Sequence, residues 1–484
     1  MRRDAPLRPI PGRRATLLSA GALLAGCTLG IDTPEAGIAA PARFTMAQGD
    51  GTVPPPDPAW WRAFSAPQLD ALMQAAMGRN LDIAAAIAQL RQADAQVRIA
   101  GAALLPTLDA DGSAGRNRSG NPFNPGSAGT ARNSFGAGLS ASYEIDFWGR
   151  NRALRESARS SAAAAAYNVG VVTLTTQRTI ATTFFAVLGA QEELVIQQGN
   201  LDLATRTLAI LRDRLTAGTA TGLDTAQQET VVAQQRAAIP PLRQTVEQNS
   251  FALATLTGVT PDQISIAALR LGAVRMPAIA AGLPSALLLR RPDVRFAEAN
   301  LAAGAANVTA ARAALFPTIT LTGSGGLQSL ALESLLRPGS VIYNLAAGIT
   351  APIFDGGLLR GQLDQSRARQ EELLANYRRA ILAALEDTES NLSAFQRGSE
   401  LVRLRAVQEA AARRAYTIAD SQLRAGTIDL LTVLSTQQSL FSARDALAQA
   451  QTQQLQAAAT LFTALGGGWT ATASAASAQR DTAP

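Results

Sequence analysis

The side chains that usually carry enzyme chemistry are nearly absent from this chain. Its 484 residues include no His, one Cys and no Lys, so all 43 cationic side chains are Arg. This composition excludes a Ser-His-Asp triad, imidazole acid–base catalysis, a catalytic Lys and a His or Cys metal cluster. Glu144 and Asp146 could form an acid–base pair on one strand face, but the polar lining of a channel would explain both acids without chemistry. We therefore expect no enzyme, no metal and no cofactor.

The single Cys stands where a lipid-modification signal would place it. Arg13 and Arg14 precede an apolar run over residues 15–25, which is too short to span a bilayer and is typical of a secretory signal. The run ends in Leu24-Ala25-Gly26-Cys27, a tetrapeptide that resembles the bacterial lipoprotein signal, in which the Cys becomes the first mature residue and is acylated. We expect acyl chains such as palmitate on Cys27 and a membrane anchor. Thr28, in place of Asp, implies sorting to the outer membrane.

The net charge does not indicate a nucleic-acid partner. The formal charge is +6, and the five arginines and one aspartate of residues 1–26 supply +4 of it. In the remainder, arginines alternate with acids and with long Gln and Ala stretches. No basic stripe follows a phosphate backbone, so nucleic-acid binding is not expected.

The chain consists of two tandem halves of similar sequence. Residues of the segment 81–115 recur at an offset of 211, and residues further along recur at an offset of 208. The first set pairs Asp82, Leu90, Val97, Pro106 and Gly112 with Asp293, Leu301, Val308, Pro317 and Gly323; the second pairs Leu215, Gly218, Thr219 and Gly258 with Leu423, Gly426, Thr427 and Gly466. Such duplication predicts two similar structural repeats.

Four segments are expected to be β-strands, at about 107–115, 135–147, 318–327 and 343–353. In the second, apolar and polar residues alternate without a fault over 13 residues, long enough to cross an outer membrane at a tilt. Alternation also fits a half-buried sheet in water, but the secretory signal and the lack of other sheet favour a membrane barrel. Four strands cannot close a barrel, because the smallest single-chain barrels have eight. The unpaired edges therefore predict oligomerisation.

The rest of the folded chain is predicted to be helical, with apolar residues seven apart, as in coiled coils. Helices are expected at 81–105, 153–216, 224–257, 292–315, 358–425 and 430–465. The helix 153–216 would be about 95 Å long, and 224–257 with 292–315 sums to about 87 Å. We therefore expect these two shorter helices to stack end to end, and 430–465 to stack likewise with 81–105. Pro240-Pro241 should kink the helix 224–257.

These features together resemble the TolC-like outer-membrane factors, in the NodT-like lipoprotein branch associated with resistance-nodulation-division pumps. The resemblance covers nearly all of the mature chain and depends on short motifs in order. They are Trp61, Phe64 and Leu69 ahead of Asn80-Leu81-Asp82; Tyr143-Glu144-Ile145-Asp146-Phe147-Trp148-Gly149-Arg150; Leu283-Pro284 and Arg290-Arg291-Pro292-Asp293; Ala313-Ala314-Leu315-Phe316-Pro317; and Ile353-Phe354-Asp355-Gly356-Gly357.

The resemblance implies a mainly α protein with a small transmembrane β part, which forms a homotrimer. Three chains of four strands would build a 12-stranded β-barrel on an α-helical barrel of long coiled-coil-like hairpins. The expected organisation is a signal peptide 1–26, an extended tether 27–58 after the acylated Cys, a first efflux-protein repeat 59–258, an equatorial insert 259–291, a second repeat 292–466 and a disordered tail 467–484.

In that family two hairpin tips bind a periplasmic adaptor, which links the duct to an inner-membrane pump. The matching residues here are Gly218, Thr219, Leu223 and Asp224 in the first tip, and Gly426, Thr427, Leu430 and Leu431 in the second. The glycines would suit any tight turn, whereas exposed leucines beside them suggest a partner. An acidic residue before the second tip lines a periplasmic gate in related ducts, which here points to Asp420 with Tyr416, although Asp420 would also suit a wet helix face.

The resulting prediction is an outer-membrane exit duct of a tripartite efflux system that passes drugs or other small molecules. Two alternatives remain: the outer-membrane component of type I secretion, and a non-conducting periplasmic scaffold lipoprotein. The alternating strands with a polar face argue against the scaffold.

Overall fold

The structure, a computed structural model, describes residues 30–39, 41–46, 57–118, 131–279 and 290–469. The predicted signal peptide and lipidation site Cys27, part of the insert 259–291 and most of the tail 467–484 lie outside the described residues. The chain divides into two compact units. The first comprises residues 1–36, 91–164 and 298–376, and the second comprises residues 37–90, 165–297 and 377–484.

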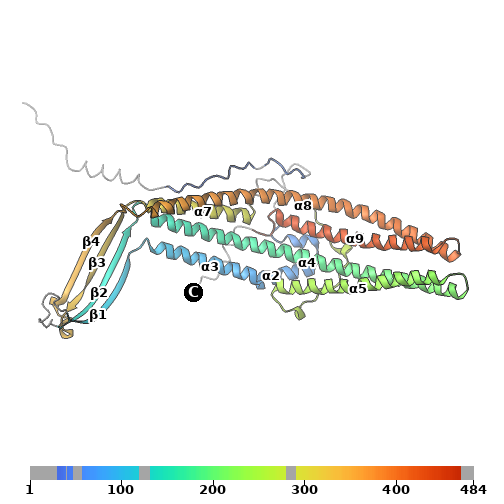
Figure 1. Cartoon of the computed structure of the whole chain (residues 1–484), viewed down its shortest axis with the longest axis horizontal. Coiled ribbons are helices and arrows are strands. Elements are labelled where there is room, and N and C mark those ends of the chain that lie inside the picture. Colours follow the sequence, from blue (N-terminus) through green and yellow to red (C-terminus); the bar gives the residue numbers. More distant parts are fainter. Residues whose placement is uncertain (1–29, 40, 47–56, 119–130, 280–289, 470–484) are drawn as a thin grey trace, which may run out of the picture. The chain divides into compact units, whose positions relative to one another are not determined.

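The first unit contains a four-stranded antiparallel sheet in the order β1-β2-β3-β4 (Figure 1). The strands are β1 (Thr107–Arg118), β2 (Ala131–Ile145), β3 (Thr318–Ser329) and β4 (Val341–Thr350). β1 pairs only with β2, and β4 pairs only with β3, so both outer strands have one unpaired edge in the described chain. The first hairpin of the sheet comes from one sequence repeat and the second hairpin from the other.

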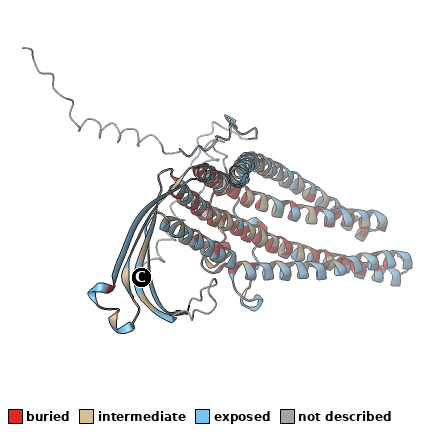
Figure 2. Cartoon of the chain, turned by 60° about the vertical axis from the view of Figure 1, so that its left-hand side comes forward, coloured by how far each residue is buried: buried red, intermediate tan, exposed pale blue. Residues whose placement is uncertain are grey.

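The register gives the sheet one apolar and one polar face. Residues directly opposite each other in neighbouring strands share a face. One face therefore carries Leu108, Phe135, Leu139, Tyr143, Leu321, Leu345 and Ile349, and the other carries Asp109, Asp111, Ser140, Ser142, Glu144, Thr320, Thr322, Ser324 and Asn344. The apolar face is uncovered in this chain, since Tyr343 and Leu345 are 82% and 81% exposed (Figure 2).

The helices form two long antiparallel hairpins and shorter partners. The first hairpin is α4 (Arg150–Thr216) with α5 (Gly222–Thr257), and the second is α8 (Leu358–Ala425) with α9 (Leu430–Ala464). The shorter helices are α2 (Pro67–Arg79), α3 (Leu81–Ala102) and α7 (Pro292–Ala313). The expectation of a mainly helical chain with a few antiparallel strands is confirmed.

The end-to-end partners of the shorter helices differ from the expected ones. At the end of α5, the Asn80 side-chain amide at the start of α3 donates to the Leu256 carbonyl at 2.9 Å. At the end of α9, Arg291 at the start of α7 donates through Nη1 to the Ala464 carbonyl at 3.2 Å. The expected stacks, 224–257 with 292–315 and 430–465 with 81–105, were therefore wrong: α5 meets α3, and α9 meets α7. The length sums could not distinguish the alternatives, because α3 and α7 both have 22 residues.

The second unit is organised around an aromatic core. Trp60 stacks on Phe462 of α9 with ring centroids 5.4 Å apart, and Phe64 lies against Phe185 of α4 at 5.0 Å. Leu69 and Met73 of α2 join this cluster and are fully buried. The motif residues near the N-terminus thus anchor α2 to the long helices.

Part of the expected tether is fixed to the body of the second unit. Phe44 is buried against Leu392, Leu461 and Leu465, and the Met46 N–H donates to the Glu389 carboxylate at 3.1 Å. The chain is therefore held at Phe44 and Met46, before it reaches the first helices.

Helix α5 continues through Pro240 and Pro241 without a break in its helical assignment. Each proline lacks the N–H that would complete the helical hydrogen-bond ladder. Polar side chains bond back within the helix, as where the Thr245 hydroxyl donates to the Pro241 carbonyl at 2.9 Å.

Candidate functional site

The two hairpin tips have nearly the same backbone. Gly218 and Gly426 both have a φ of +75°, the left-handed conformation that ends many helices and that a side chain disfavours. The Thr219 N–H donates to the Arg214 carbonyl at 2.8 Å, and the Thr427 N–H donates to the Gln422 carbonyl at 3.0 Å. Both threonine hydroxyls donate to the same carbonyls as their own N–H groups. The duplicated sequence thus gives a duplicated turn.

The two tips differ in how the returning helix begins. In the first, Thr221 caps α5 in a capping box with Asp224: the Asp224 N–H donates to the Thr221 hydroxyl at 3.2 Å, and the Thr221 N–H donates to the Asp224 carboxylate at 2.7 Å. In the second, the Asp429 carboxylate alone caps α9 by accepting from the Thr432 N–H at 2.7 Å. That bond lowers the pKa of Asp429. The sequence analysis missed both caps, although a Thr or Asp before an apolar helix start is the usual signal.

The tips present a small apolar and hydroxyl surface. Leu223 is 66% exposed and Leu431 is 70% exposed, and Thr219 and Thr427 are exposed as well. Leu430 differs, since it is 8% exposed and packs in the cluster between the hairpins. Asp224 is engaged within its own capping box. The residues that a partner could reach are thus fewer than those predicted.

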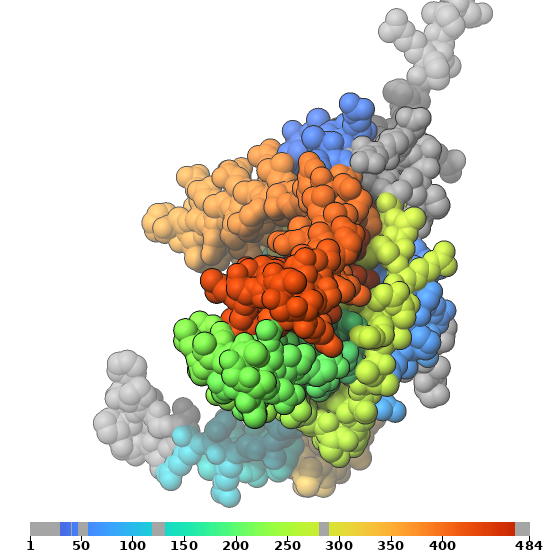
Figure 3. All heavy atoms as spheres, turned by 90° about the vertical axis from the view of Figure 1, so that its right-hand side faces the viewer, coloured from blue at the N-terminus to red at the C-terminus, as the bar shows by residue number. Residues whose placement is uncertain are grey.

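The two tips lie side by side in the second unit (Figure 3). Leu208 and Leu211 of α4 and Val232 of α5 pack with Leu423 of α8 and Phe441 of α9. Arg214 Nη1 also donates to the Leu423 carbonyl at 2.9 Å, across the two hairpins. This carbonyl lies in the last turn of α8, where a cation interacts favourably with the helix dipole. The tips therefore form one continuous surface.

The predicted gate residues occupy different environments. Tyr416 is buried between the hairpins, with its hydroxyl 3.4 Å from that of Thr207. Burial raises the pKa of the Tyr416 hydroxyl, against the bond with Thr207, which lowers it. Asp420, one helical turn later, accepts from Arg424 Nε at 3.0 Å. In this chain, then, Tyr416 is part of the hairpin core, whereas Asp420 is partly exposed and paired with Arg424.

Comparison with known sequences and structures decides the family. The profile of the outer membrane efflux protein family matches residues 72–259 and 283–467, one segment in each repeat. The chain belongs to this family. The pyoverdine export outer membrane protein OpmQ of Pseudomonas aeruginosa is 41% identical over 94% of this chain and 97% of its own length. The toluene efflux pump outer membrane protein TtgI of Pseudomonas putida is 34% identical over 84% of this chain and 86% of its own.

Solved structures agree with this assignment. The outer-membrane channel OprN superposes with a TM-score of 0.86 and 26% identity, covering 91% of this chain and 99% of that one. The chain is thus an outer-membrane efflux channel protein with the fold of its family.

The carboxylates that could have served chemistry in this efflux protein are structural. Asp146 accepts from the Asn151 and Arg152 N–H groups at 3.0 and 2.9 Å, so it caps the start of α4, and it also pairs with the Arg152 side chain at 3.1 Å. Glu144 lies 3.9 Å from Arg150. Among the described residues no group of three or more acids, His or Cys is placed to hold a metal ion. The family is one of channel proteins.

Proposed function

We propose that three copies of this chain join through the outer strands of their sheets to form a 12-stranded barrel that continues into an α-helical barrel. The unpaired edges of β1 and β4 support this, because exposed strand edges pair with another chain or are protected. The uncovered apolar face would contact lipid, and the polar face with Asp109, Asp111 and Glu144 would line a water-filled lumen.

In this proposal the trimer is the exit duct of a tripartite efflux system. The paired tips dock on a periplasmic adaptor through Leu223 and Leu431, with Gly218, Thr219, Gly426 and Thr427 shaping the turns. An inner-membrane resistance-nodulation-division pump supplies the substrate. The acylated Cys27 anchors the chain in the outer membrane. Support for the tip assignment comes from the two large apolar side chains that no other part of the described chain covers.

For the gate, we propose Asp420 as the residue that lines the aperture and Tyr416 as its support. Three copies of Asp420 would form an acidic ring that favours cations, and Tyr416 would act by holding α8 against α4 through Thr207. Asp420→Ala should therefore change the cation selectivity and its pH dependence in single-channel recordings. Unchanged conductance and selectivity would remove Asp420 from the gate.

The substrate class we propose is small molecules delivered by the pump, with pyoverdine as the first compound to test. The 41% identity with OpmQ over almost the whole chain favours that order.

The observation that carries the proposal is a two-faced sheet with two free edges. Its test is planar-bilayer conductance of the purified full chain, together with the oligomer mass in detergent. Conducting trimers are expected; a monomer without conductance would leave the non-conducting scaffold as the better explanation.

Adaptor docking has a separate test. Leu223→Asp and Leu431→Asp should abolish copurification with the adaptor and leave conductance unchanged. Gln234→Asp introduces a carboxylate at an exposed position of α5 about three turns beyond the tip and serves as the matched control. Equal loss in all three variants would argue against docking at the tips.

A further inference from the structure

The end of the sheet that carries the connecting loops has an unusual set of arginines. In β1, Arg116 and Arg118 follow Ala114 at alternate positions, and Ala114 lies opposite Phe135 in β2. Side chains two residues apart share a face of a strand. Arg116 and Arg118 therefore extend the apolar face of the sheet, whereas Arg132, opposite Asn117, lies on the polar face.

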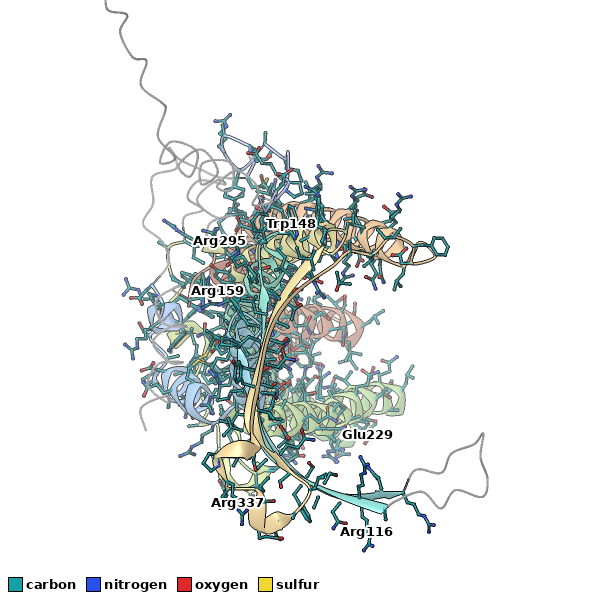
Figure 4. All side chains as sticks on the ribbon, turned by 90° about the vertical axis from the view of Figure 1, so that its left-hand side faces the viewer. Arg116, Trp148, Arg159, Glu229, Arg295 and Arg337 are labelled. Carbon is teal, nitrogen blue, oxygen red and sulfur yellow. The ribbon has the colours of Figure 1, made fainter. Side chains whose placement is uncertain are left out.

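These cations stand in a segment without negative charge. Residues 112–143 contain three arginines and no Asp or Glu, and the β3–β4 connection adds one residue of each sign, Glu333 and Arg337. Figure 4 shows Arg116 and Arg337 at this loop end of the sheet. Both side chains are exposed, and neither forms an ion pair within the part of the chain that the structure describes.

The opposite end of the same sheet makes a useful contrast. There, Arg150 lies 3.9 Å from Glu144, and Arg152 lies 3.1 Å from Asp146. Cations at that end are matched by carboxylates of the chain itself. At the loop end the chain places arginines next to an apolar surface, and residues 112–143 include no acidic residue.

We infer that Arg116 and Arg118, with Arg337, bind the phosphate groups of the lipid leaflet that surrounds the loop end of the sheet. Guanidinium groups bind phosphate oxygens through two parallel hydrogen bonds, and an apolar band directly below them would hold the acyl chains of the same lipid. The inference rests on the proposed membrane-spanning barrel, in which the loop end faces outwards. The ligand class is a phosphorylated glycolipid, as found in the outer leaflet of bacterial outer membranes.

The test compares lipid binding by matched variants of the purified full chain in detergent, with bisphosphorylated lipid A as the probe. An arginine near an anionic lipid surface contributes about fivefold to binding, so Arg116→Gln with Arg118→Gln should weaken binding by about 25-fold. Arg116→Gln alone should weaken binding by about fivefold. Arg132→Gln also removes one charge at the same end of the sheet, but on the polar face, and should change binding less than about twofold. Fully dephosphorylated lipid A should bind wild type and the double variant alike.

Three results would overturn the inference. The first is unchanged binding in the double variant, and the second is a loss in Arg132→Gln equal to that in Arg116→Gln. The third is displacement of lipid A by equimolar inorganic phosphate, which would indicate a free phosphate site. Arg116→Lys with Arg118→Lys keeps the charge, so retained binding in this variant shows that a loss in the glutamine variant is not misfolding. Conductance is recorded in parallel. A wild-type chain that binds lipid A but does not conduct would count against the channel and not against the lipid site.

Discussion

The two halves of the chain make the same helix junction with different chemistry. In the first half, α5 ends at Gly258, and the neutral side chain of Asn80 joins it to α3. In the second half, α9 ends before Gly466, and the charged side chain of Arg291 joins it to α7. Both glycines adopt a positive φ, +68° and +73°, and each lies against the residue that precedes its junction residue.

The charged junction has more partners than the neutral one. Arg291 binds both oxygens of Asp293 at 3.0 and 2.7 Å and reaches Asp387 of α8 at 2.8 Å, with its side chain only 13% exposed. Burial works to lower the pKa of Arg291, but the bonds to Asp293 and Asp387 outweigh it and raise that pKa. Asn80 caps α3 by accepting from the Ile83 N–H and donates to the Leu256 carbonyl. The Arg291 side chain therefore bonds to three helices, and the Asn80 side chain bonds to two.

The largest expected effect is the loss of the charged junction. Arg291→Ala removes the charged partner of Asp387 and one donor to the Ala464 carbonyl, which within the described chain keep only the Asn391 amide and the Thr388 hydroxyl as donors. Breaking an ion pair whose Arg side chain is 13% exposed costs about 3 kcal/mol. The free energy of unfolding, followed by tryptophan fluorescence, should fall by this amount. Arg270→Ala removes an ion pair in which the Arg side chain is 66% exposed and should cost about 0.5 kcal/mol or less. Equal losses would mean that the junction adds nothing beyond a surface pair.

The neutral junction should matter less. Asn80→Ala removes a helix cap and one bridging bond, which together are worth about 1–2 kcal/mol. Asn80→Asp keeps the cap but places a carboxylate against the Leu256 carbonyl, so it separates the two roles. If denaturant titrations gave Asn80→Asp the stability of wild type, the bridge to α5 would be unimportant and the two junctions would not be counterparts.

The sequence predicts features that depend on neighbouring residues better than it predicts contacts between residues far apart along the chain. The tip glycines and the alternation in β2 are local signals: both glycines adopt a positive φ, and the strand expected at 135–147 overlaps β2, Ala131–Ile145. The junction pairing was not predicted correctly, because α3 and α7 have equal length and the contacts of Asn80 and Arg291 join residues 176 and 173 positions apart. The burial of Tyr416 could not be predicted either, since on a helix of 68 residues a small supercoil decides which face is covered.

The two hairpin tips allow the halves of the chain to be compared a second time. Gly218→Ala and Gly426→Ala each place a side chain in the left-handed region, which costs about 1–2 kcal/mol. Both glycines have a φ of +75°. A Cβ would meet no atom within 4 Å at Gly218 and only the far end of the Arg214 side chain, 4.0 Å away, at Gly426. The two losses of stability should therefore be equal within about 0.5 kcal/mol. A clearly larger loss at one tip in melting experiments would show that the two turns are not energetically equivalent.

The smallest expected effect concerns the N-cap residues, of which Asp429 carries a charge and Thr221 does not. The Asp429 carboxylate has a lowered pKa because it accepts from the Thr432 N–H, whereas the Thr221 hydroxyl does not titrate. A carboxylate with a lowered folded-state pKa stabilises the fold above its unfolded pKa, near 3.8, and loses that contribution as the pH falls through the folded value. The second tip should therefore loosen below about pH 4 while the Thr221 cap does not respond through its own protonation.

Hydrogen exchange of the α9 N-terminus from pH 5 to pH 3, corrected for intrinsic rates, measures this loosening. Asp429→Asn keeps a capping side chain without the charge and should flatten the pH dependence at the second tip, while Thr221→Asn should leave the pH dependence there unchanged. A second tip whose protection fell with pH equally in wild type and Asp429→Asn would show that some other group controls it.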